Sequence, residues 1–73
     1  MKIELIVGRK YEREIFEVKA DKDPNQIAII LLRLSRPYLM SNDIDATWDS
    51  NTKTGTVIVG GFRKVGHAKV IEA

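Results

Sequence analysis

Apolar and polar residues alternate along five stretches of this chain, and a period of two is typical of half-buried β-strands. The stretches that show the alternation are 2–7, 12–20, 44–49, 56–60 and 67–72. Gly8-Arg9-Lys10 separates the first two, so a β-hairpin is the simplest interpretation of this part of the chain. The last three strands follow one another and are divided only by turn-rich segments.

One helix is predicted between the second and third strands. Asp23 is a suitable N-cap, and Pro24 suits the first helical position. Gln26 stands three residues after the cap, as in a capping box. The helix is expected to end just before Pro37, because proline disfavours the helical conformation in the residue that precedes it. An apolar stripe would face the sheet, formed by Ile27, Ile30, Leu31 and Leu34.

These elements, in the order ββαβββ, predict one small α+β domain over residues 1–73, with an antiparallel sheet and one helix packed on one face. The chain has no cysteine, so it can form neither a disulfide nor a thiolate zinc site, which fits a reducing compartment. Its longest apolar run covers six residues, 27–32, far below the roughly 20 that span a bilayer. We expect a cytoplasmic protein, monomeric or homodimeric, with no membrane contact.

Candidate catalytic and metal chemistry is sparse in this sequence. His67 is the only imidazole and stands in no catalytic motif. Asp45 and Asp49 lie on one strand face, but about 13 Å of strand would separate them, too far for one ion. The glycines of segment 60–66 lack the spacing of a phosphate-binding loop. We therefore expect a protein that is not an enzyme, with no catalytic residue, no metal and no cofactor.

The net charge is +2, from twelve basic and ten acidic residues, which gives only weak general attraction to nucleic acid. Basic residues nevertheless gather at two turns. The first turn has Arg9, Lys10 and Arg13, and the last has Arg63 and Lys64. The basic side chains of such turns can bind phosphate groups, or they can simply be solvated, and both interpretations stay open. Three of the five aromatic residues are expected in the core, namely Phe16, Trp48 and Phe62. Few rings would then remain for stacking on bases.

Four isoleucines are predicted to point away from the helix: Ile6, Ile15, Ile58 and Ile71. Monomers seldom expose contiguous apolar patches, so neighbouring isoleucines would require a cover, from a dimer mate, a partner protein or the chain's own segment 38–40. Alternatively, single exposed β-branched residues are ordinary in strands. We predict that this open face, with Arg9, Lys10 and Arg13 as a charged rim, binds a larger protein.

In size, in its lack of cysteine, in its Met-Lys-Ile start and in its one-domain α+β pattern without an enzyme motif, the chain resembles small regulators encoded by bacteriophages. Some of these regulators bind and inhibit the host RNA polymerase. The resemblance implies a phage-type protein that modulates transcription by contacting polymerase. It covers the whole chain without a diagnostic motif, so it assigns no role to any individual residue. A small nucleic-acid-binding module that uses the basic turns is the alternative.

Overall fold

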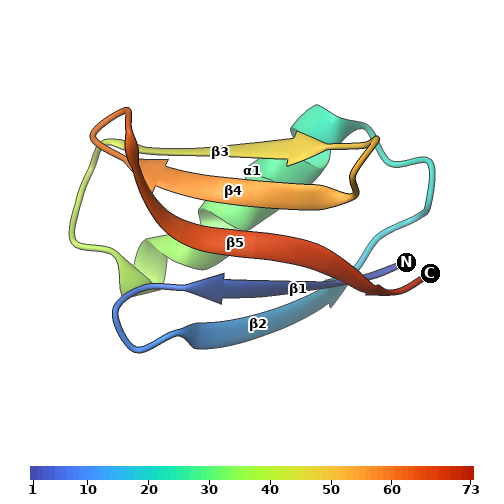
Figure 1. Cartoon of the computed structure of the whole chain (residues 1–73), viewed down its shortest axis with the longest axis horizontal. Coiled ribbons are helices and arrows are strands. Elements are labelled where there is room, and N and C mark those ends of the chain that lie inside the picture. Colours follow the sequence, from blue (N-terminus) through green and yellow to red (C-terminus); the bar gives the residue numbers. More distant parts are fainter.

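Five antiparallel strands form one sheet, and a single α-helix packs against one face of it, in the computed structural model of residues 1–73 (Figure 1). The predicted α+β class and the ββαβββ order are confirmed. The elements along the chain are β1 (Lys2–Val7), β2 (Glu12–Glu17), α1 (Pro24–Ser35), the 3₁₀ turn η1 (Arg36–Tyr38), β3 (Ile44–Asp49), β4 (Thr54–Val59) and β5 (Arg63–Glu72).

The strands lie in the order β2-β1-β5-β4-β3, so the first and last strands of the chain are paired in the middle of the sheet. Helix α1 links the two edge strands and therefore crosses the whole sheet on one side (Figure 1). It packs mainly against β3 and β4. This topology brings the β1–β2 turn, the segment after η1 and the β4–β5 turn to the same end of the sheet, at the left of Figure 1.

The core lies between the helix and the inner face of the sheet. Alternate residues of β1 are completely buried there, while the residues between them face away from the helix, as the period of two predicts. Of the predicted stripe of α1, Ile27 and Leu31 are buried and Leu34 packs against the core, whereas Ile30 is only half-buried. Ile29 on the outer side of the helix is exposed, as predicted. The buried apolar residues are Ile3, Leu5, Val7, Ile27, Leu31, Trp48, Val57 and Ala68.

Both ends of α1 follow from local sequence. The Asp23 carboxylate accepts the Asn25 amide at 2.8 Å, which confirms Asp23 as the N-cap, although this bond is one residue short of the capping-box geometry. The helix ends at Ser35, whose buried hydroxyl donates to the Leu31 carbonyl at 2.7 Å. Pro37 then lies in the 3₁₀ turn. No helix in the structure is long and apolar enough to cross a membrane.

Several sequence predictions about the strands and the core were wrong. β4 covers Thr54–Val59 instead of residues 56–60. β2 ends at Glu17 instead of residue 20, and β5 begins at Arg63 instead of residue 67. The extension of β5 leaves only three residues, 60–62, in the β4–β5 turn, and Gly60 and Gly61 supply the positive φ angles it requires, +62° and +79°. Phe62 follows them at the tip of the turn and is 88% exposed, so it is not a core residue.

Candidate functional site

The end of the sheet where three connections meet contains a cleft with a volume of about 920 Å³. It is bounded by the β1–β2 turn, by the segment that follows η1, and by the β4–β5 turn with the start of β5. Four cationic side chains that line it are exposed: Arg9, Lys10, Arg63 and Lys64. We call this region the basic end.

Backbone hydrogen bonds hold the two basic turns beside each other. The Gly8 amide donates to the Val65 carbonyl at 3.0 Å, which continues the β1–β5 pairing into the first turn. The turn then closes through the Tyr11 amide, which donates to the Gly8 carbonyl at 3.2 Å. Arginines that are far apart in the sequence, at positions 9 and 63, are placed side by side because β5 inserts between β1 and β4.

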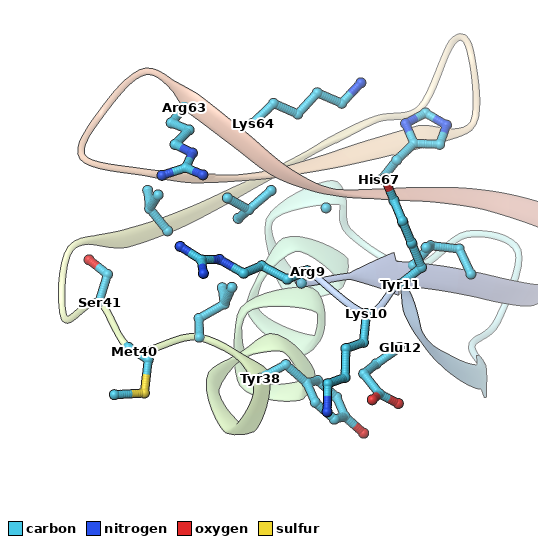
Figure 2. A pocket seen from close by; sticks show the side chains of 16 residues that line it. Arg9, Lys10, Tyr11, Glu12, Tyr38, Met40, Ser41, Arg63, Lys64 and His67 are labelled. Carbon is cyan, nitrogen blue, oxygen red and sulfur yellow. The ribbon is translucent and has the colours of Figure 1, made fainter.

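The side chains of Arg9 and Arg63 extend into the same cleft from the two turns, whereas Lys64 points away from it (Figure 2). The two ion pairs of the chain join Lys2 to Glu72 and Arg13 to Glu4, so none of the four cations forms an ion pair. Like charges that converge without a counter-ion repel each other, and an anion between them removes this repulsion. The cleft is therefore suited to an anionic group.

Three large apolar side chains at the basic end are exposed to solvent: Tyr11 and Met40 line the cleft, and Phe62 directly precedes Arg63. Tyr11 is 78% exposed, Phe62 is 88% exposed and Met40 is fully exposed. Tyr11 also has a positive φ of 53°, which is uncommon for a bulky residue. Sequence reasoning missed these three side chains. A signal was present, since each aromatic adjoins a glycine-containing turn and a pair of basic residues, in Gly8-Arg9-Lys10-Tyr11 and Gly61-Phe62-Arg63-Lys64.

A hydrogen bond between Tyr38 and Glu14 closes the basic end on the helix side of the sheet. The Tyr38 hydroxyl donates to the Glu14 carboxylate at 2.5 Å, and this bond is the main reason why the pKa of Tyr38 is raised. Desolvation and the negative charges of Glu14 and Glu12 raise the pKa further. The bond attaches η1 to the edge strand β2.

The structure brings together only part of the predicted protein-binding surface. Ile6, Arg9 and Lys10 line the cleft, and Ile58 lies opposite Lys64, which lines it too. Segment 38–40 does not cover the open face as one of the predicted alternatives required, because Tyr38 and Leu39 pack against the core.

The other three predicted residues lie apart from the cleft. Arg13 is on the open face of the sheet, where its Nε donates to the Glu4 carboxylate at 2.6 Å. Ile15 lies opposite Glu4, farther along the hairpin, and is 42% exposed. Ile71 is at the opposite end of β5, beside the irregular pairing with Lys2.

The four isoleucines do not form a contiguous stripe. Ile6 lies between Arg13 of β2 and His67 of β5, and Ile58 lies between Asp45 and Lys64. Charged or polar cross-strand neighbours therefore separate the isoleucines. This favours the alternative that Ile15 and Ile71 are ordinary, singly exposed strand residues.

Acidic and imidazole side chains do not gather into a site. His67 is exposed on the open face, opposite Ile6 and Thr56. No three histidine or acidic side chains come close enough to hold a metal ion. Comparison of this chain with protein-family models, with curated proteins and with solved structures found no match.

Proposed function

We propose that this protein is a non-enzymatic regulatory binding protein of the cytoplasm, and that it contacts a larger protein through the basic end. One observation supports this most: two segments far apart in the sequence direct Arg9 and Arg63, neither of them in an ion pair, into one cleft that the exposed ring of Tyr11 also lines. Aromatic residues, methionine and arginine are the residues enriched where proteins bind each other. Ile6 and Ile58 extend the apolar part of this surface onto the adjoining open face.

The backbone of Tyr11 gives a second argument. A left-handed conformation costs about 1–2 kcal/mol for a residue with a side chain. Tyr11 adopts this conformation at φ 53° while its side chain remains 78% exposed, so the ring recovers little of that cost by packing. Strained residues of this kind are concentrated at functional sites, which supports a role for Tyr11 in contact with a partner.

The resemblance to bacteriophage regulators makes RNA polymerase the partner that we propose, with inhibition or modulation of transcription as the result. The four unpaired cations would then act chiefly on the rate of association, because charges at the rim of an interface steer the encounter. The rings of Tyr11 and Phe62 would contribute most of the affinity as apolar anchors.

Nucleic-acid binding is the second candidate, because rings beside arginines are also the arrangement that stacks and neutralises single strands. We expect such binding to be weak and strongly dependent on salt, with a log–log slope of about −0.7 for each phosphate neutralised. Only four unpaired cations are available at the basic end, and the open face beyond it also presents the acidic residues Asp45 and Asp49.

Affinity capture from a bacterial extract, with and without nuclease, tests these proposals. We expect the wild-type protein to recover RNA polymerase subunits in both cases, and the double variant Arg9→Gln/Arg63→Gln to recover much less. The matched control is Lys22→Gln/Lys53→Gln, which removes two exposed charges outside the basic end and should capture as well as the wild type. Loss of every captured protein after nuclease treatment would favour the second candidate instead.

A further inference from the structure

We propose that the cleft between Arg9 and Arg63 binds a short acidic segment of the partner protein, with one carboxylate held between the two guanidinium groups. This inference rests on the proposed function and adds the chemistry of the segment that is recognised. Both arginines extend into the cleft from separate turns (Figure 2), and neither has a carboxylate partner within the chain. A guanidinium group presents a planar fork of donors that matches a carboxylate in two parallel hydrogen bonds.

The floor of the cleft is apolar. Leu39, Val59 and Val65 line it and are half-buried, and Met40 is exposed at its margin. An apolar floor lowers the local dielectric, which strengthens the attraction between the arginines and an anion. It also offers a contact for an apolar side chain next to the bound carboxylate. A segment that combines acidic and apolar residues therefore fits this cleft better than an isolated anion does.

The surroundings favour a short acidic segment over a long polyanion. Glu12 lines the cleft beside the first turn and places a carboxylate at its margin. A nucleic-acid strand that ran past the first turn would bring several phosphates near this carboxylate and be repelled. A peptide segment with one or two acidic residues needs only the space between the arginines.

A titration of the isotope-labelled full chain, followed by NMR, tests the inference. The probe is an acetylated hexapeptide with two glutamates that flank a phenylalanine. Its control is the same peptide with glutamines in place of the glutamates. We expect the acidic peptide to shift the amides of residues 8–11 and 60–64 in a saturable way, and the glutamine peptide to bind at least tenfold more weakly, because it lacks the charge.

Variants of the two arginines identify the groups responsible. Arg9→Gln and Arg63→Gln should each weaken binding of the acidic peptide about tenfold, the effect of losing one charge-assisted hydrogen bond. Arg9→Lys should weaken it as well, since lysine keeps the charge but lacks the fork. Lys53→Gln should bind like the wild type. All these side chains are exposed, so the dispersion of the amide spectrum should show that each variant is folded.

Three results would overturn the inference: no saturable shift with the acidic peptide, equal affinity in the double variant Arg9→Gln/Arg63→Gln, or tighter binding of a six-nucleotide thymidine oligomer. If capture of the partner still depends on both arginines while the acidic peptide does not bind, the proposed function stands and this inference fails. If the peptide binds as expected while capture ignores both arginines, the cleft accepts acidic segments but the proposed contact surface is wrong.

Discussion

The Cδ1 methyl group of Leu31 lies 2.7 Å from the point that a β-carbon on Gly55 would occupy. The Thr47 carbonyl oxygen and the Cε3 atom of Trp48 are each 2.9 Å from the same point. Carbon atoms do not normally approach so closely, so α1 can pack this near to β4 only because residue 55 has no side chain. The glycine therefore sets the distance between the helix and the sheet.

We expect Gly55→Ala to lower the free energy of unfolding by about 1–3 kcal/mol, the usual cost of inserting a methyl group into a packed core. Urea denaturation followed by tryptophan fluorescence would measure it, since Trp48 lies at the contact. A variant with wild-type stability would show that the helix can move away from the sheet at little cost.

The Leu31→Ala variant provides a second test of this contact. Alone, it should cost about 2–5 kcal/mol, because Leu31 is completely buried and its removal leaves a cavity. In combination with Gly55→Ala the cost should be less than the sum, by about 0.5–3 kcal/mol, since the methyl group that blocks residue 55 is gone. Strict additivity in a double-mutant cycle would assign the cost of Gly55→Ala to Thr47 and Trp48 alone.

Replacement of Tyr11 should separate stability from binding. Asparagine tolerates the left-handed conformation, so Tyr11→Asn should raise the free energy of unfolding by up to about 1 kcal/mol while it weakens capture of the partner. Lys53 also has a positive φ, 57°, in a turn away from the basic end, and Lys53→Asn is the matched control. It should stabilise the protein similarly and leave capture unchanged. If Tyr11→Asn destabilises the fold, the exposed ring makes stabilising contacts that outweigh the cost of the left-handed conformation.

The bond between Tyr38 and Glu14 predicts a loss of stability at high pH. The pKa of Tyr38 in the folded protein lies above the value of about 10 that it has in the unfolded chain. At a pH between these two pKa values the folded state binds more protons than the unfolded state does, so the free energy of unfolding decreases as pH rises above about 10. The Tyr38→Phe variant cannot titrate, and its stability should fall less steeply over that range. Thermal unfolding of both proteins from pH 8 to pH 11 measures the difference, and parallel curves would contradict the prediction.

Ile15→Lys distinguishes the basic end from the open face as the contact surface. Ile15 is 42% exposed and lies opposite Glu4, so a lysine there should change the free energy of unfolding by no more than about 0.5 kcal/mol. Capture of the partner should also persist, since Ile15 is outside the cleft. Loss of capture by this folded variant, judged by its amide spectrum, would restore the open sheet face that alternation alone predicted as the binding surface.

Local patterns in the sequence determined most of the secondary structure. β1 and β3 have the predicted bounds, because alternation leaves one face to bury and turn residues limit each strand. The helix begins after Asp23 and ends before Pro37 for equally local reasons, a side-chain cap and a steric restriction. The face of each strand also follows from the period of two, and so Ile6, Ile15 and Ile58 are directed away from the helix as predicted.

Only the tertiary structure decided which segments are neighbours. Alternation specifies the face of a strand but says nothing about its partner, which depends on how the whole sheet buries its inner side under one helix. The insertion of β5 between β1 and β4 brings the start of β5, with Arg63, beside the turn that carries Arg9. Arg13 is much closer to Arg9 in the sequence, but it lies on β2 and pairs with Glu4. The same pairing shortens the last turn and turns Phe62 outward, and it leaves Tyr38 beside Glu14. The basic end exists because strand order, a property of the folded sheet, brings these distant residues together.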